Sequence, residues 1–277
     1  MKMEYHEFRF RGIPEPIREI LMAELSELGF ESFLEEQDGF SGYIPAYTYE
    51  DKKIIPYLEK KSKATGFIFE QKKIKAENWN AVWESQYHPV LIEQKCLIRA
   101  PFHDPIPGIT YDILIEPKMS FGTGHHETTS LMIGMMMKEH VKGKRVLDMG
   151  CGTGILAILA LKMDAGIVYA IDTDEWAFQN AKDNIRKNIV PAITVIKGDV
   201  HSIPAGVYDL ILANINRNVL IEDIPVYARH LSHTGILLLS GFYLDDLPLI
   251  SARAEENKLK FIHSVNRNQW VAAKYYK

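Results

Sequence analysis

The sequence predicts an α/β protein in which a small α+β domain precedes a larger domain built around a parallel sheet. Three observations predict this arrangement. Residues 1–76 show the order strand–helix–strand–strand–helix–strand. From residue 144 onward strands and helices alternate regularly, which is typical of a parallel sheet with helices on both faces. Near the start of that alternation a glycine-rich turn follows a buried strand, which is typical of a ligand site.

Hydrophobic periodicity predicts each element of the small domain. The predicted elements are a strand at 5–12, a helix at 14–29, strands within 30–39 and 40–47, a helix at 50–64 and a strand at 67–75. We expect Pro56 to interrupt or kink the second helix, because proline removes a helical hydrogen bond. The order is the ferredoxin-like one. The domain has 12 lysines and arginines against 14 acidic residues, which does not suggest an RNA-binding sheet.

Residues 77–88 predict a helical linker, in which Trp79 and Trp83 serve as apolar contacts between the two domains. The larger domain then spans residues 89–277. Its predicted elements are a small β unit at 90–102 and 109–117, a helix at 130–141, strands at 144–150, 167–174, 193–200, 208–215 and 235–243, helices at 154–165, 175–188 and 219–231, and a closing hairpin at 260–277.

The composition is that of an ordinary globular protein. Of 277 residues, 47% are apolar and 25% are charged, and the net charge of −4 argues against a broad nucleic-acid surface. No apolar run reaches the roughly 20 residues of a membrane helix, and the N-terminus has no apolar signal-peptide core. Cys96 and Cys151 form no CxxC pair, so we expect a cytoplasmic protein without disulfides. Nothing in the sequence demands more than a monomer.

The glycine-rich turn lies in VLDMGCGTG, residues 146–154. Its spacing is GxGxG and not the GxGxxG of dinucleotide sites, and no Gly-Lys-Ser/Thr follows as in a phosphate loop. Asp148 directly before the turn would repel a pyrophosphate, but it suits a cofactor that carries positive charge, such as S-adenosylmethionine. Gly150 and Gly152 would let the backbone approach the amino-acid part of that cofactor. The alternative for Asp148 is that it caps a helix.

Two further acids end the next strands. Asp172 closes IVYAID, 22 residues after Gly150, where a carboxylate can accept hydrogen bonds from both ribose hydroxyls. Enzymes that bind NAD share this kind of ribose recognition, so Asp172 alone does not identify the cofactor. Asp199 in GDV either faces the adenine amine or makes a turn.

Other reactive side chains have simpler explanations. Cys151 lies inside the turn, where a small residue is needed, and we do not expect a reactive thiol there. His125 and His126 are adjacent and therefore diverge, and no third ligand has a suitable spacing, so we expect no metal. His126 either orders its loop or accepts a proton. The methionines at 135–137 are expected to fill the core.

The motifs DMGCGTG and AIDTD resemble those of class I S-adenosylmethionine-dependent methyltransferases, which have a Rossmann-like sheet. The loop MSFGTGHHETT (119–129) resembles the AFGTGTHPTT signature of the ribosomal protein eleven (large subunit) methyltransferase family. The strand end ANINRN, the connector ENWNAVW and the following HPVLI resemble the same family. The resemblance therefore covers nearly the whole chain in order.

The resemblance implies S-adenosylmethionine as the cofactor and an N-terminal domain that recognises the substrate protein and swings relative to the catalytic domain. It implies that the family's cofactor-contacting positions are Thr129, Gly150, Asp172 and Asn214. The motif residues Asp148, Gly152, Phe121 and Thr123 complete the candidate cofactor site. The family methylates amino groups of a basic ribosomal protein, namely the N-terminal α-amine and lysine ε-amines of large-subunit protein eleven.

Three positions depart from the family pattern. Glu127 stands where the family usually has proline, Asn216 where it usually has leucine, and Lys118 where glycine is frequent. The rest of the signature loop is intact. We therefore expect the departures to affect the fine shape of the substrate channel and not the cofactor pocket.

Asn214 is the predicted catalytic residue. It ends the strand 208–215, and its amide carbonyl can accept an N–H bond from a substrate amine and aim the amine lone pair. Related amine methyltransferases continue with Pro-Pro and an aromatic residue, which ANIN lacks, so an aliphatic amine is favoured over a flipped base. Phe121 would supply an apolar wall over the methyl group. Asn216 is either a second acceptor or a loop cap.

The sequence thus predicts a cytoplasmic protein N-methyltransferase that binds neither membranes nor nucleic acid. Two alternatives stay open at this point. One is a class I methyltransferase that acts on another protein, a small molecule or an RNA amine. The other is a non-catalytic binding module, against which the intact set of glycines, acids and Asn214 argues.

Overall fold

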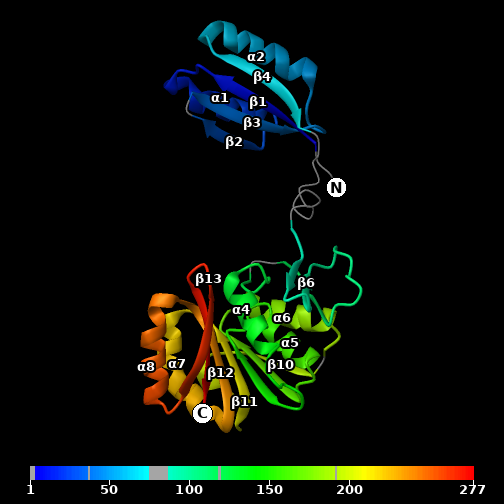
Figure 1. Ribbon diagram of the computed structural model, residues 1–277. Coiled ribbons are helices and arrows are strands. Elements are labelled where there is room, and N and C mark those ends of the chain that lie inside the picture. The colour runs from blue at the N-terminus through cyan, green and yellow to red at the C-terminus, as the bar shows by residue number, and fades with distance from the viewer. Residues whose placement is uncertain (1–3, 37, 75–86, 118–119, 191) are drawn as a thin grey trace. The chain divides into compact units, whose positions relative to one another are not determined.

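The computed structural model describes residues 4–36, 38–74, 87–117, 120–190 and 192–277. The chain divides into two compact units, Met1–Tyr87 and His88–Lys277, which are described separately below (Figure 1). Most of the predicted linker at 77–88, with Trp79 and Trp83, lies outside the described residues, as does Lys118. No helix among the described residues is long and apolar enough to cross a membrane.

The first unit is a four-stranded antiparallel sheet with the strand order β2-β3-β1-β4. Its elements are β1 Tyr5–Arg11, α1 Glu15–Glu27, β2 Ser32–Glu36, β3 Gly39–Pro45, α2 Asp51–Thr65 and β4 Ile68–Ile74. Phe8 and Phe10 of the central strand pack in one apolar cluster with Leu21 of α1 and Leu58 of α2. Both helices therefore cover the same face of the sheet, and the ferredoxin-like prediction is confirmed.

The predicted interruption at Pro56 is wrong, because α2 runs through Pro56 without a break. The helix ends at Gly66, whose φ of 84° lies in the left-handed region that glycine adopts easily. Ile54 and Leu58, which flank the proline four residues apart, are fully buried. Packing of this apolar face outweighs the hydrogen bond that proline removes.

The second unit contains a seven-stranded sheet with the order β10-β9-β8-β11-β12-β14-β13. Its strands are β8 Arg145–Met149, β9 Ile167–Asp172, β10 Ile193–Lys197, β11 Tyr208–Asn214, β12 Leu231–Tyr243, β13 Lys260–Arg267 and β14 Trp270–Tyr276. The first five strands pair in parallel, whereas β14 and β13 add an antiparallel hairpin at one edge. The predicted parallel sheet and closing hairpin are both confirmed.

Helices cover both faces of this sheet (Figure 1). They are α4 Glu127–Met136, α5 Ile155–Lys162, α6 Glu175–Lys187, α7 Arg217–His230 and α8 Leu247–Glu256. Apolar residues of α4, α5 and α6 form one buried cluster with alternate sheet residues, and those of α7 and α8 form a second cluster with the others. Val146 belongs to the first cluster and Leu147 to the second, as the alternation of a strand requires.

Three details differ from the predictions. The predicted β unit consists of three strands, β5 Val90–Ile92, β6 Cys96–Arg99 and β7 Tyr111–Leu114, because a tight turn splits the first stretch. Helix α4 begins three residues before the predicted start, because the His126 side chain caps it. The sequence pattern did not predict α8, in which only Ile250 and Ala254 are buried.

Candidate functional site

A cavity of about 1230 Å³ lies at the carboxyl ends of the central strands. Met149 at the end of β8, Asp172 at the end of β9 and Asn214 at the end of β11 all line it. This is where an open parallel sheet places its ligand. The volume exceeds the roughly 300–1,000 Å³ of common ligand pockets, so the cavity can hold a cofactor together with a substrate side chain.

The structure brings five of the eight predicted site residues to this cavity, namely Phe121, Gly150, Gly152, Asp172 and Asn214. Three others, Asp148, Thr123 and Thr129, lie nearby in the chain but are not among the residues that line it. Asp199 and Asn216 do line the cavity.

The glycine turn after β8 takes a left-handed backbone, with φ of 66° at Gly150 and 54° at Gly152. A Cβ atom at Gly152 would lie 2.3 Å from the carbonyl oxygen of Phe121, which no real structure tolerates. The sequence predicts that these glycines let the backbone approach a cofactor. The structure shows a second reason for glycine at 152. Because Gly152 has no Cβ atom, the loop that carries Phe121 can pack directly against the turn.

That loop is held directly against the turn. The Thr153 backbone N–H donates to the Phe121 carbonyl at 3.0 Å, and its buried hydroxyl donates to the Gly122 carbonyl at 2.6 Å. Gly122 has a φ of 99°, which allows the loop to bend there. The signature loop and the glycine turn thus form one hydrogen-bonded wall of the cavity.

Asp148 contacts α5 and is not among the residues that line the cavity. Its carboxylate is 1% exposed and accepts a hydrogen bond from the Ala157 backbone N–H at 3.1 Å. The N-cap position of α5 is Gly154, which has no side chain to cap the helix, so Asp148 satisfies a first-turn N–H from the neighbouring strand. Burial raises the pKa of Asp148 to about 7. The observed contact is therefore the helix-capping one.

Asp172 both shapes the turn and faces the cavity. One carboxylate oxygen accepts from the Gly152 N–H at 2.8 Å, and the other accepts from the Asp174 N–H at 3.0 Å. Each oxygen keeps a second lone pair, so the carboxylate can still accept from ribose hydroxyls. Asp199 accepts from the His201 N–H at 2.9 Å and thus makes a turn, while it also lines the cavity.

Asn214 offers an unused acceptor. Its Oδ1 atom is buried and has no hydrogen-bond partner within the described residues, although the residue lines the cavity. Burying such an oxygen without a partner costs about 1–3 kcal/mol, which a ligand N–H would remove. Asn216, two residues later, accepts from the Val219 N–H at 3.2 Å and caps α7, as the loop-cap alternative predicts.

The histidine pair orders the signature loop. The His126 Nδ1 accepts from the Thr128 backbone N–H at 3.3 Å, and the His125 Nε2 lies 2.9 Å from the His88 carbonyl. Thr123 contacts the His125 ring through its hydroxyl at 3.4 Å. In the part of the chain that the structure describes, no three histidine, cysteine or acidic residues are grouped to hold a metal.

Thr129 and Cys151 are both buried beside the site. Thr129 is 1% exposed, and its hydroxyl has no hydrogen-bond partner in the described part of the chain. Burial raises the pKa of the Cys151 thiol well above its usual value, because desolvation disfavours the thiolate. Cys151 is therefore a small packing residue and not a reactive thiol.

Sequence reasoning missed an aromatic rim on the cavity. The rings of His126 and Trp270 lie 4.8 Å apart, and His126 also contacts Phe121 at 5.1 Å. The Tyr243 ring packs against Trp270 in a tilted arrangement, with the ring centroids 4.2 Å apart. Trp270 begins β14 and is far from the signature loop in sequence, so only the folded hairpin brings it there. Trp176, 78% exposed, lines another part of the same cavity.

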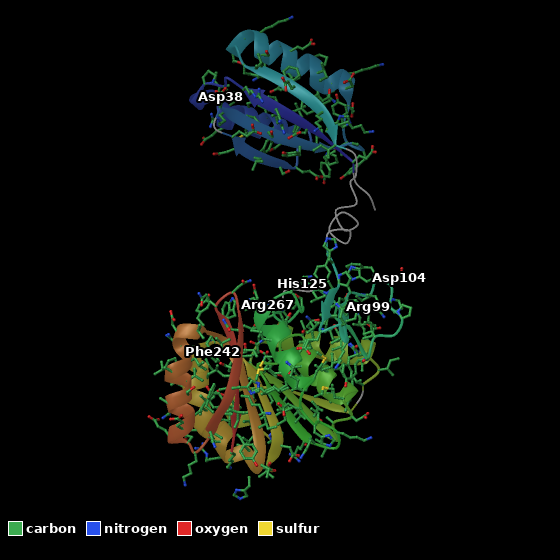
Figure 2. All side chains as sticks on the ribbon, in the orientation of Figure 1. Asp38, Arg99, Asp104, His125, Phe242 and Arg267 are labelled. Carbon is green, nitrogen blue, oxygen red and sulfur yellow. The ribbon has the colours of Figure 1, made fainter. Side chains whose placement is uncertain are left out.

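The departure at Glu127 has a structural explanation. Its carboxylate accepts a hydrogen bond from Asn268 Nδ2 at 3.0 Å, which connects the start of α4 to the turn of the β13–β14 hairpin. This bond lowers the pKa of Glu127. Figure 2 shows Arg267 of the same hairpin and His125 of the signature loop toward the same end of the second unit. The substitution therefore helps to hold the rim that carries Trp270.

Comparison with known proteins identifies relatives along the full chain. The family model described as ribosomal protein L11 methyltransferase (PrmA) matches residues 21–277. A ribosomal protein L11 methyltransferase of Bacteroides thetaiotaomicron is 42% identical over 99% of both chains. One of Porphyromonas gingivalis is 43% identical over 94% of this chain and 91% of its own.

Solved structures agree with these matches. A ribosomal protein L11 methylase of Lactobacillus delbrueckii subsp. bulgaricus is 29% identical, with a TM-score of 0.64 over 68% of this chain and 98% of its own. A methyltransferase of Pyrococcus furiosus, 18% identical with a TM-score of 0.51 over 60% of this chain and 89% of its own, shares the fold. The class I, Rossmann-like prediction is thereby confirmed. This chain belongs to the ribosomal protein L11 methyltransferase family, whose members are S-adenosylmethionine-dependent enzymes.

Proposed function

We propose that this protein transfers methyl groups from S-adenosylmethionine to amino groups of ribosomal protein L11, namely its N-terminal α-amine and lysine ε-amines. Two features support the proposal. The relatives that match nearly the full chain are named ribosomal protein L11 methyltransferases. The cavity, in turn, has the residues that such a reaction needs.

The cavity fits the cofactor. The proposed binding residues that face it are Phe121, Gly150, Gly152, Asp172 and Asn214. Asp172 would accept from the ribose hydroxyls, and the glycine turn leaves space for the amino-acid part. Asp148, Thr123 and Thr129 are also proposed cofactor-site residues, although they are not among the residues that line the cavity. When bound, the cofactor supplies an electrophilic methyl group on a positively charged sulfur.

The charge of the cavity suits a cationic cofactor and an amine substrate. Five acidic residues line it, namely Asp172, Asp174, Asp183, Asp199 and Asp223, and the described lining includes no lysine or arginine. A site for nucleic-acid phosphates needs the opposite sign of charge. The negative charge of the cavity lining therefore favours an aliphatic amine of a basic protein over an RNA substrate.

The substrate amine must be neutral to attack. The usual pKa is about 10.4 for a lysine amine and about 7.7–8.0 for an α-amine, so a lysine carries the larger deprotonation cost. Transfer of the amine out of water lowers its pKa and reduces this cost. The Asn214 Oδ1 would accept one N–H of the amine and thereby direct the nitrogen lone pair. Phe121 would shield the reacting atoms from water.

The single observation that carries the proposal is the buried, unpartnered Oδ1 of Asn214 at the end of β11. A folded protein rarely buries an acceptor without use. Here the acceptor lies in the wall of the same cavity as Asp172 and the glycine turn.

We also propose that residues 1–76 form a substrate-recognition domain, that residues 77–88 form a helical linker and that residues 89–277 form the catalytic domain. The face of the first sheet opposite α1 and α2 carries Leu34 and Ile68, which are 57% and 61% exposed. These two residues lie on the opposite edge strands β2 and β4, so the proposed recognition role rests on the family resemblance and not on an apolar patch. The protein would act as a monomer in the cytoplasm, where ribosomal proteins are made.

Mass spectrometry tests the proposal. Purified, unmethylated ribosomal protein L11 is incubated with the protein and S-adenosylmethionine, and cofactor binding is measured in parallel. Mass gains in steps of one methyl group, mapped to the N-terminus or to lysines, are the expected result. Cofactor binding without any gain would reject L11 as the acceptor. Failure of both would reject catalysis itself.

A further inference from the structure

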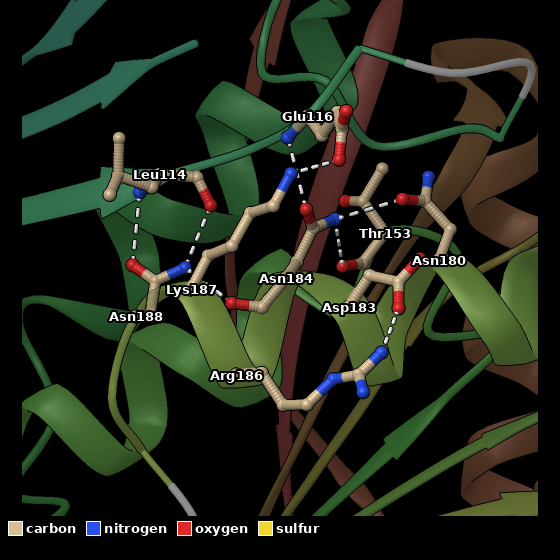
Figure 3. Close-up of polar contacts among 9 residues, drawn as sticks. All are labelled: Leu114, Glu116, Thr153, Asn180, Asp183, Asn184, Arg186, Lys187 and Asn188. Carbon is tan, nitrogen blue, oxygen red and sulfur yellow. Dashed lines mark hydrogen bonds and ion pairs between the residues drawn. The ribbon is translucent and has the colours of Figure 1, made fainter. Parts of the chain in front are cut away.

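Helix α6 carries an asparagine ladder on its buried side. Asn180, Asn184 and Asn188 are spaced four residues apart and are 2%, 0% and 9% exposed (Figure 3). Residues at this spacing lie on one face of a helix. Asparagine is a poor helix former, so three of them on a buried face indicate a hydrogen-bonding task.

The amide orientation of Asn184 is fixed by two backbone groups. The Glu116 N–H can only donate, and it donates to Asn184 Oδ1 at 3.0 Å. The Thr153 carbonyl can only accept, and it accepts from Asn184 Nδ2 at 2.9 Å. A flipped amide would lose both bonds. Asn184 therefore connects the glycine turn to the strand end that leads into the signature loop.

Asn188 completes the lower part of the ladder. It accepts from the Leu114 N–H at 2.9 Å and donates to the Leu114 carbonyl at 2.7 Å. Its Nδ2 also donates to the Asn184 carbonyl at 2.8 Å. All polar atoms of this side chain thus have protein partners, and Asn188 does not line the cavity.

Asn180 differs from the other two. Its Oδ1 accepts from Asn184 Nδ2 at 3.3 Å, and since Asn184 cannot flip, this assignment is fixed as well. The Nδ2 of Asn180 must therefore lie on the far side of the amide, as Figure 3 shows. That nitrogen is buried and has no hydrogen-bond partner in the described part of the chain, yet Asn180 lines the cavity.

From this geometry we infer that Asn180 is a further cofactor-binding residue, whose Nδ2 donates a hydrogen bond to an oxygen of S-adenosylmethionine. The inference rests on the proposed function, because it needs the cofactor in this cavity. The cofactor offers two kinds of oxygen acceptor, the ribose hydroxyls and the carboxylate. Asp172 supplies acceptors to the same cavity, and Asn180 adds a buried donor that has no protein partner in the described part of the chain. Asn184 is the positioning residue that holds the donor in place.

Calorimetric titration with S-adenosylmethionine tests the inference on the full chain. We expect Asn180→Ala to weaken binding about tenfold, the usual effect of one lost hydrogen bond at a ligand. Asn180→Asp replaces the donor by a second acceptor. Asp172 would already take the ribose hydroxyl hydrogens, and a cofactor carboxylate would be repelled, so we expect this variant to bind S-adenosylmethionine at least as weakly as Asn180→Ala does.

Asn188→Ala is the matched control. It removes an asparagine of the same ladder without touching the cavity, so we expect a lower thermal midpoint and unchanged cofactor affinity. Equal affinity of wild-type protein and Asn180→Ala would overturn the inference. Absence of binding to the wild-type protein would instead reject the proposed function.

The wild-type protein gives a readout that does not depend on a stable variant. The side-chain NH2 resonance of Asn180, assigned from its loss in Asn180→Asp, should shift and its hydrogens should exchange more slowly when S-adenosylhomocysteine is added. An Asn180 resonance that stays unchanged at saturating ligand would contradict the proposed hydrogen bond.

Discussion

The backbone N–H of Thr153 donates to the carbonyl of Phe121 at 3.0 Å and so joins the glycine turn after β8 to the signature loop. The two segments are more than 30 residues apart in the sequence. Gly152, directly before Thr153, makes the contact possible because it has no Cβ atom. One backbone hydrogen bond therefore aligns the two segments that form the cavity wall.

Gly152→Ala should disrupt this contact. The added Cβ would lie 2.3 Å from the Phe121 carbonyl, and the residue would have to keep a φ of 54°. We expect a loss of stability of about 2 kcal/mol and at least tenfold weaker cofactor binding. Gly143→Ala is the control, since Gly143 has a φ of 71° but open space around its Cβ. Thermal denaturation and calorimetry would measure both effects, and equal cofactor affinities of the two variants would contradict the account.

Asp148 should make stability depend on pH. Burial raises its pKa to about 7 in the folded protein, against about 3.9 in an unfolded chain. Between these values the folded state holds a proton that the unfolded state has released. The contribution of Asp148 to stability is therefore fully present below about pH 4 and declines as the pH rises to about 7.

Asp148→Asn removes that dependence, because the amide is neutral at every pH and can still accept from the Ala157 N–H. We expect the thermal midpoint of the variant to rise relative to the wild type as the pH increases from 4 to 7. Melting curves over this range give the difference. A midpoint difference that is constant across the range would show that Asp148 does not titrate as described.

Asp172→Ala should weaken cofactor binding strongly. The change removes the proposed ribose acceptor and also leaves the Gly152 and Asp174 N–H groups without their carboxylate partner. We expect at least about tenfold weaker binding of S-adenosylmethionine, since hydrogen bonds to a charged group contribute about 1.5–3 kcal/mol each. Calorimetry measures the change. Affinity equal to that of the wild type would refute the ribose assignment.

Much of the fold follows from local pattern. The positions of Asp172 and Asn214 at strand ends could be predicted because the carboxyl ends of parallel strands meet at one edge of the sheet. The direction of Asp148 could not be predicted. Both faces of this sheet are buried, so apolar residues stand on both sides of β8. The hydrophobic pattern therefore does not show toward which face the Asp148 carboxylate points.

The residues that the sequence did not reveal depend on long-range packing. Trp270 reaches His126 only because the β13–β14 hairpin closes the sheet edge and Asn268 bonds to Glu127. Asn180 faces the cavity because Asn184 fixes its amide, and Asn184 in turn depends on a strand end 68 residues earlier. Hydrophobic periodicity within one segment cannot predict contacts between residues so far apart in the sequence.

The most direct test of the central claim is Asn214→Ala, measured for cofactor affinity and for the single-turnover rate of methyl transfer to ribosomal protein L11. Asn218→Ala, exposed and outside the cavity, is the control. We expect Asn214→Ala to lower the transfer rate about 100-fold, in the range found for loss of one positioned polar group. We expect a much smaller loss of cofactor affinity. A variant that transfers methyl groups as fast as the wild type would contradict the proposed role of Asn214 in orienting the amine.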